Sequence, residues 1–218
     1  MQTEQQIAFD KILSLIEEAG CAEHLILVGS WVEFAYENAG YIEGFRSNLR
    51  TRDVDFLVRN LRRPSPAARL SALAREQGYL IDFDRLNGTT KIFDSKTGLE
   101  VEFLIGKVGA GREPSLRTNV GVTAQALRHL DILSGNTVSL ECLGHVVTVP
   151  TPEAYVVHKM VINEERGAKA EKDAAAIEHL LGFLDGEKLK AVLRGLSKKE
   201  RARVETFIVR RGLEGKFK

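Results

Sequence analysis

The sequence has few of the residues that cross-link a small fold or hold a structural metal ion. Its 218 residues include only two cysteines, Cys21 and Cys142, with no CxxC spacing. We therefore expect neither a disulfide framework nor a structural zinc site. A reducing, cytoplasmic location fits this use of cysteine.

Long apolar segments and two nucleotide-binding signatures are missing as well. No apolar run approaches the roughly 18 residues of a membrane span, so no membrane partner is expected. The first ten residues, MQTEQQIAFD, lack the basic start and apolar core of a signal peptide. No GxxxxGK[ST] loop occurs, and Gly106, Gly109 and Gly111 have the wrong order and spacing for a dinucleotide fingerprint.

The composition is that of an ordinary globular protein, with 44% hydrophobic residues, 28% charged residues and a net charge of +1. The charge is unevenly spread, because residues 185–218 contain eleven Lys and Arg against five Asp and Glu. This basic segment has two interpretations, a solvated helical surface or a surface that contacts RNA or another polyanion.

Hydrophobic periodicity predicts a mixed α/β (α+β) fold. Residues 3–19 and 31–38 are expected to be helices, and residues 24–30 form an apolar run typical of a strand covered on both faces. Further strands are expected over residues 53–58, 79–83, 89–93, 99–105, 137–142 and 145–149, with a helix over 64–78 and a loop over 106–119.

The C-terminal part of the chain has the signals of a helical domain. Thr151-Pro152 is typical of a helix start, and Ser197 followed by Glu200 fits a capping box. We therefore predict a mixed-sheet domain over residues 1–150 and a helical domain over residues 151–218.

Asp53 and Asp55 open the strand expected over residues 53–58. Residues i and i+2 of a strand project to the same face, so both carboxylates point one way while Val54 points into the core. Two like charges this close repel each other unless a cation lies between them, and Mg²⁺ prefers such oxygen ligands. A short DxD pattern also fits two solvent-facing acids on an edge strand.

Glu100 and Glu102 form a second same-face acidic pair in the strand expected over residues 99–105. If this strand lies beside the Asp53 strand, Glu102, or Glu100 as the alternative, completes a cluster of three carboxylates. Such clusters hold two metal ions about 3.5–4 Å apart during in-line phosphoryl displacement. One acid can also help to deprotonate an attacking hydroxyl.

Gly29 and Ser30 lie where the apolar strand gives way to the next helix. Glycine lets the backbone approach a phosphate closely, and the helix start supplies N–H groups that favour an anion. Ser30 adds a hydroxyl donor. Alone, however, a Gly-Ser pair after a strand also fits an ordinary turn.

Taken together, these residues resemble the nucleotidyltransferase superfamily that shares the DNA polymerase β fold. Residues 27–36 (LVGSWVEFAY) and 51–57 (TRDVDFL) are similar to uncharacterised bacterial nucleotidyltransferases. Residues 149–160 (VPTPEAYVVHKM), followed by Glu171-Lys172-Asp173, look like the helical half of abortive-infection toxin nucleotidyltransferases.

The resemblance implies a transferase that moves a nucleoside monophosphate from an NTP, foremost ATP, to a hydroxyl of RNA or protein, with Mg²⁺ as cofactor. It implies that Asp53, Asp55 and Glu102 are catalytic residues and metal ligands, and that Gly29 and Ser30 bind the nucleotide. Two features depart from the family pattern. The 22 residues between Ser30 and Asp53 are a longer spacing than usual, and the third acid is Glu where Asp is common.

Lys159 is a further expected nucleotide-binding residue. Residues 154–162 are apolar nearly all round, which predicts a helix buried between the domains, and Lys159 is the only formal charge in that stretch. A buried ammonium needs an anionic partner. The resemblance offers the triphosphate or the carboxylate cluster as that partner, and the alternative is that Lys159 extends to solvent.

Two other functions remain open at this point. A catalytically inactive module that binds a nucleotide or RNA would keep the same fold, as would a partner-dependent toxin of a toxin–antitoxin pair. The sequence does not indicate an oligomeric state.

Overall fold

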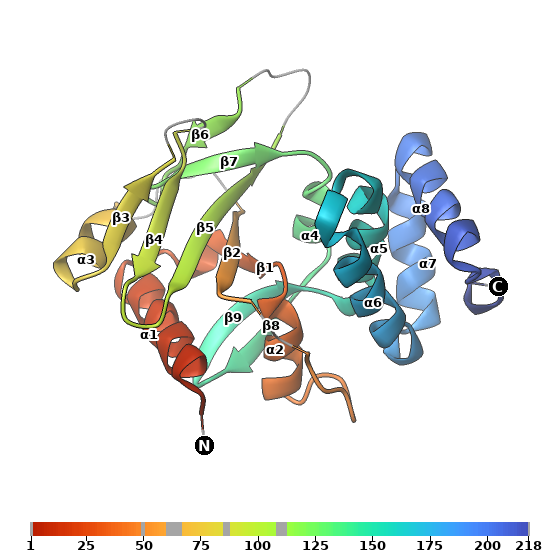
Figure 1. Ribbon diagram of the computed structural model, residues 1–218, viewed down its shortest axis with the longest axis horizontal. Coiled ribbons are helices and arrows are strands. Elements are labelled where there is room, and N and C mark those ends of the chain that lie inside the picture. Colours follow the sequence, from red (N-terminus) through yellow and green to blue (C-terminus); the bar gives the residue numbers. More distant parts are fainter. Residues whose placement is uncertain (1, 49–50, 60–66, 85–87, 108–112, 218) are drawn as a thin grey trace. The chain divides into compact units, whose positions relative to one another are not determined.

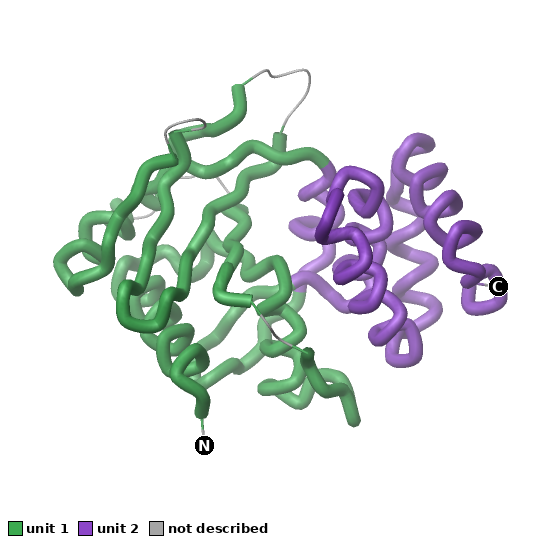
Figure 2. The backbone as a smooth tube through the Cα atoms, viewed as in Figure 1, with its two compact units in different colours: residues 1–128, 138–149 green, residues 129–137, 150–218 purple. Residues whose placement is uncertain are grey.

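The computed structural model describes residues 2–48, 51–59, 67–84, 88–107 and 113–217 (Figure 1). The chain forms two compact units (Figure 2). Unit 1 comprises residues 1–128 and 138–149, and unit 2 comprises residues 129–137 and 150–218. The prediction placed all residues up to 150 in the first domain, whereas residues 129–137 fold with unit 2. In the described part of the chain, no helix is long and apolar enough to cross a membrane.

A mixed sheet dominates unit 1, and the predicted fold class is thereby confirmed. Five strands follow the order β1 (Leu25–Val28), β2 (Asp53–Val58), β5 (Leu99–Gly106), β4 (Thr90–Asp94) and β3 (Leu80–Phe83). Strands β2 and β5 are parallel, whereas the other neighbours on this path are antiparallel. Strand β7 (Thr123–Leu127) pairs with the end of β5 and with β6 (Ser115–Arg117).

The two faces of the central strands differ in burial. Val54 and Phe56 of β2 and Val101 and Phe103 of β5 are buried, whereas the acids that alternate with them are exposed or half-buried. Burial of each side chain of this size stabilises the fold by about 1.5–3 kcal/mol. These four residues therefore determine which face of the sheet is turned to the core. Helices α1 (Glu4–Glu18), α2 (Trp31–Asn38) and α3 (Leu70–Glu76) pack against the sheet.

Two expectations for unit 1 were wrong in detail. The segment expected as a loop contains strand β6, and strand β7 was not predicted. Both strands owe their pairing to hydrogen bonds across the sheet rather than to local periodicity. The helix expected from residue 64 begins only at Leu70, since residues 67–69 are not helical. Its two prolines, Pro64 and Pro66, lie outside the described residues.

Strands β8 (Thr137–Cys142) and β9 (His145–Pro150) lie where two short strands were predicted, and they form a separate two-stranded sheet. Its turn residues, Leu143 and Gly144, have φ of 55° and 84°, as a tight two-residue hairpin turn requires. His145 joins the hairpin to helix α1, because its ring nitrogens lie 3.0 Å from carboxylate oxygens of Asp10 and Glu17.

Unit 2 is built around helix α5 (Pro152–Ile162). This helix contacts α4 (Asp131–Ser134), α6 (Ala170–Leu180), α7 (Gly186–Gly195) and α8 (Lys198–Arg211), and residues 152–161 are all buried. Both predicted caps are confirmed. The Thr151 hydroxyl accepts from the Ala154 N–H, and Ser197 and Glu200 form a capping box.

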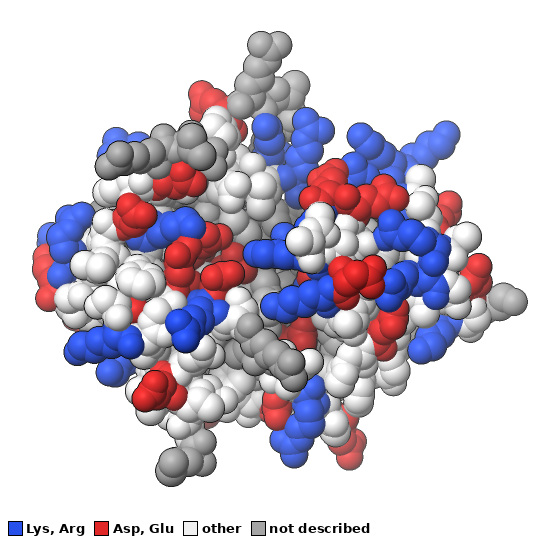
Figure 3. Space-filling model, viewed as in Figure 1, with Lys and Arg blue, Asp and Glu red and all other residues white. Residues whose placement is uncertain are grey.

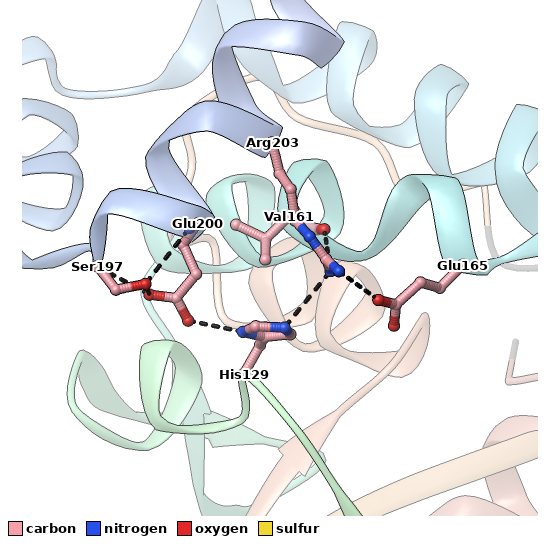
Figure 4. Close-up of polar contacts among 6 residues, drawn as sticks. All are labelled: His129, Val161, Glu165, Ser197, Glu200 and Arg203. Carbon is pink, nitrogen blue, oxygen red and sulfur yellow. Dashed lines mark hydrogen bonds and ion pairs between the residues drawn. The ribbon is translucent and has the colours of Figure 1, made fainter.

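A polar network explains why residues 129–137 fold with unit 2 (Figure 4). His129 Nδ1 lies 2.7 Å from Glu200 Oε1, and the other carboxylate oxygen of Glu200 accepts from the Ser197 hydroxyl. Arg203 lies 3.4 Å from His129 Nε2 and pairs with Glu165 at 2.6 Å. These contacts join a segment that precedes β8 to a helix near the end of the chain.

Much of the positive charge of helix α8 is paired within unit 2. Three of its arginines bind acids that precede or belong to α6, in the pairs Arg203–Glu165, Arg210–Glu164, Arg211–Glu171 and Arg211–Glu178. This pairing favours a structural, solvated surface over an RNA-binding one for the basic segment.

His158 gives unit 2 a predicted pH dependence. The side chain is buried, and desolvation together with the nearby charge of Lys159 lowers its pKa to about 3. Below the ordinary histidine pKa the unfolded chain takes up a proton that the folded chain does not, so stability is lost as pH falls. We expect this group to lower the free energy of unfolding by about 2 kcal/mol between pH 7 and pH 5.

The measurement is denaturant unfolding at the two pH values for wild type and His158→Met. The variant is expected to lose about 2 kcal/mol of the pH dependence, whereas His179→Gln, at an exposed site, should keep it. An unchanged pH dependence in His158→Met would contradict the assignment.

Candidate active site

The register of β2 on β5 gathers the predicted acids on one face of the sheet. Asp53 lies opposite Glu100, and Asp55 lies opposite Glu102. Residues opposite each other on neighbouring strands share a face, so the four carboxylates form two adjacent pairs. In the view of Figure 3, acidic side chains gather over the middle of the sheet in unit 1. The condition set by the sequence, that the two acidic strands be neighbours, is met.

The Gly29-Ser30 turn follows β1, and Gly29 lies beside Asp55. Val28 pairs with Asp55, and Gly29 follows with a φ of 69°. A Cβ atom at position 29 would lie 2.1 Å from Oδ2 of Asp55, so only glycine leaves room for this carboxylate. Ser30 precedes helix α2, and its side chain makes no capping hydrogen bond. The Gly29-Ser30 turn and Asp55 thus form one local structure.

Lys91 of strand β4 is a site residue that the sequence did not single out. It lies opposite Glu102 in the antiparallel register, and its ammonium forms ion pairs with both Glu100 and Glu102, the second at 2.5 Å. Desolvation by burial lowers the pKa of Lys91, but hydrogen bonds to the two glutamates and their charges outweigh it, so the pKa is raised. The short connection between β4 and β5, residues 95–98, was the available signal, because it fixes this register.

The donor set fits a hard divalent cation. Asp53, Asp55 and Glu102 offer carboxylate oxygens on one face, the ligands that Mg²⁺ prefers. Within the described residues, however, no three His, Cys, Asp or Glu side chains are gathered into a ready metal-binding group. One oxygen of the Glu102 carboxylate, Oε1, is paired with Lys91.

Lys159 has an anionic partner in unit 2. Its ammonium lies 2.5 Å from Asp173 Oδ1, and Arg166 binds the other oxygen of the same carboxylate at 2.7 Å. Burial raises the pKa of Asp173, but the charges and hydrogen bonds of Lys159 and Arg166 outweigh it and hold the pKa below its usual value. Lys159 is 7% exposed, so the alternative of extension to solvent is wrong. A nucleotide contact of Lys159 stays a prediction.

Comparison with known proteins shows the family. The sequence profile described as Nucleotidyltransferase matches residues 8–199, which span both units. The chain therefore belongs to the nucleotidyltransferase family, and the resemblance drawn from its motifs is confirmed. It is a transferase of nucleotidyl groups. A search of curated proteins found no match.

Solved structures share the fold along the whole chain. An antigenic nucleotidyltransferase-like protein from Paracoccidioides brasiliensis is 13% identical, with a TM-score of 0.59, over 98% of this chain and 92% of that one. The antibiotic-resistance factor ANT(2'')-Ia is 15% identical, with a TM-score of 0.50, over 99% of this chain and 98% of that one. At these identities the likeness concerns the fold.

Substituting Gly29 by alanine tests the turn. Gly29 and Gly44 have similar φ angles, 69° and 72°, but a Cβ atom at position 44 would meet no atom within 4 Å. Alanine at either site costs about 1–2 kcal/mol for the left-handed conformation. Only Gly29→Ala must also displace Asp55. We expect Gly29→Ala to destabilise the protein more than Gly44→Ala in denaturant unfolding, and to lose nucleotidyl transfer at least about tenfold.

Equal stability and equal activity of the two variants would show that the Asp55 carboxylate does not depend on the glycine.

Proposed function

We propose that unit 1 catalyses the Mg²⁺-dependent transfer of a nucleoside monophosphate from an NTP, foremost ATP, to a hydroxyl of RNA or protein. In this proposal the Gly29-Ser30 turn holds the triphosphate, and Asp53, Asp55 and Glu102 hold the metal ion. Lys159 is kept as a proposed nucleotide-binding residue.

One observation carries the proposal. Two acidic pairs lie in register on one sheet face, and Asp55 of the first pair packs on the Gly29 backbone. The turn favours an anion, but the nearby carboxylates repel an anion unless a cation is bound between them. A metal-bound triphosphate provides both charges in one molecule, which is why this juxtaposition favours nucleotidyl transfer.

The proposed reaction is an in-line displacement at the α-phosphorus. The acceptor hydroxyl oxygen forms a bond to the α-phosphorus of the NTP, and the bond from that phosphorus to the bridging oxygen breaks. Pyrophosphate leaves, and a carboxylate on the acidic face takes the proton of the attacking hydroxyl. When bound, Mg²⁺ supplies positive charge that stabilises the charge developing on the phosphate oxygens. The backbone N–H groups after Gly29 orient the triphosphate.

A second function, that of an inactive nucleotide-binding module, is favoured by the engagement of Glu102 with Lys91. In that case the turn would bind an NTP while the acidic face performs no transfer. Calorimetry with ATP separates the two functions, since binding without turnover supports the module.

Substitution of the aspartates provides the direct test. The full chain is incubated with NTPs labelled at the α-phosphate, Mg²⁺, and total RNA or total protein. We expect label to be transferred by wild type, and Asp53→Asn or Asp55→Asn to reduce the rate roughly a hundredfold or more, because each removes a metal ligand.

Asp82→Asn is the matched control. Asp82 lies on β3 directly opposite Lys91, so it is an acid of the same sheet face outside the proposed ligand set. It is expected to keep nearly full activity. Transfer by Asp55→Asn at the wild-type rate would refute the catalytic assignment.

A further inference from the structure

Sheet register places Glu102 between a carboxylate and an ammonium. Asp55 of β2 lies opposite Glu102 on one side, and Lys91 of β4 lies opposite it on the other. Directly opposed side chains share a face and lie about 4.5–5.5 Å apart at their Cβ atoms. Glu102 can therefore turn toward Asp55 or toward Lys91, and in this structure it binds Lys91.

Glu100 has different neighbours. It lies opposite Asp53 on β2 and opposite Phe93 on β4, so its direct neighbour on β4 is uncharged. It reaches Lys91 diagonally and forms an ion pair with the same ammonium. Lys91 thus holds both glutamates, each of which has an aspartate opposite it on β2, but it lies directly opposite only Glu102.

The three side chains are only partly shielded from water. The exposed fractions are 27% for Lys91 and 31% for each glutamate. A divalent cation can therefore reach Glu102 from solvent. It would then compete with Lys91, because a carboxylate oxygen that contacts an ammonium cannot also hold a divalent cation without bringing the two positive charges together.

We propose that Lys91 is a positioning residue that binds both glutamates before a metal ion arrives, then yields Glu102 to the metal and retains Glu100. The inference rests on the proposed function, and it assigns the third carboxylate to Glu102. Through its pairs with Glu100 and Glu102, Lys91 reduces the repulsion among the acids of β2 and β5. It also weakens metal binding, so that a metal ion bound with its NTP competes better than free metal.

The test measures Mn²⁺ binding to the full chain without nucleotide, by electron paramagnetic resonance of free Mn²⁺. Lys91→Met removes the competing charge at similar length, and we expect it to bind Mn²⁺ at least about tenfold more tightly than wild type. Lys91→Arg keeps the charge and is expected to bind like wild type. Equal or weaker binding by Lys91→Met would overturn the inference, since a merely structural lysine would not restrain the metal.

Two double variants test which glutamate is released. In the Lys91→Met background, Glu102→Gln is expected to abolish the gain in affinity, and Glu100→Gln to leave most of it. The reverse pattern would overturn the assignment of Glu102. Thermal melting of each variant confirms that it is folded.

Asp55→Asn separates this inference from the proposed function. If Asp55→Asn loses Mn²⁺ binding while Lys91→Met binds like wild type, the inference about Lys91 fails and the metal site stands. If neither wild type nor Lys91→Met binds Mn²⁺, with or without ATP, both fail.

Discussion

The parallel register between β2 and β5 is the constraint on which the site depends. It is held by apolar side chains on the opposite face, where Val54, Phe56, Val101 and Phe103 are buried. A slip of one residue would turn the acids into the core and the apolar side chains to water, at a cost of several kcal/mol. The hydrophobic core thus sets the positions of the carboxylates, although no carboxylate belongs to it.

Electrostatics adds a second requirement, because a face with four acids on two adjacent strands is unfavourable in isolation. Lys91 offsets part of this negative charge through its ion pairs with Glu100 and Glu102. Asp55 is held by different means, at the Gly29 backbone. Three of the four acids are therefore positioned in two ways, Glu100 and Glu102 by a lysine and Asp55 by a turn.

Local signals were enough for much of the fold and for the main site residues. Alternation in the strands placed Asp53, Asp55, Glu100 and Glu102 on shared faces, and short-range caps predicted the helix start at Thr151. Contacts between distant segments were beyond such signals, as the pairing of β7 with the end of β5 shows. The contact of His129 with α8 and the pairing of Lys159 with Asp173 could not be predicted either, because no local pattern relates these residues. The role of Lys91 could have been predicted from the register of β4 on β5, because the short turn between these strands fixes that register.

The proposed metal and nucleotide sites can be located together in a crystal structure with Mn²⁺ and a non-hydrolysable NTP analogue. Anomalous scattering locates the metal ion without ambiguity. We expect Mn²⁺ in contact with Asp53, Asp55 and Glu102, and the triphosphate at the Gly29-Ser30 turn. A triphosphate bound elsewhere, or a metal ion that contacts neither aspartate, would contradict this expectation.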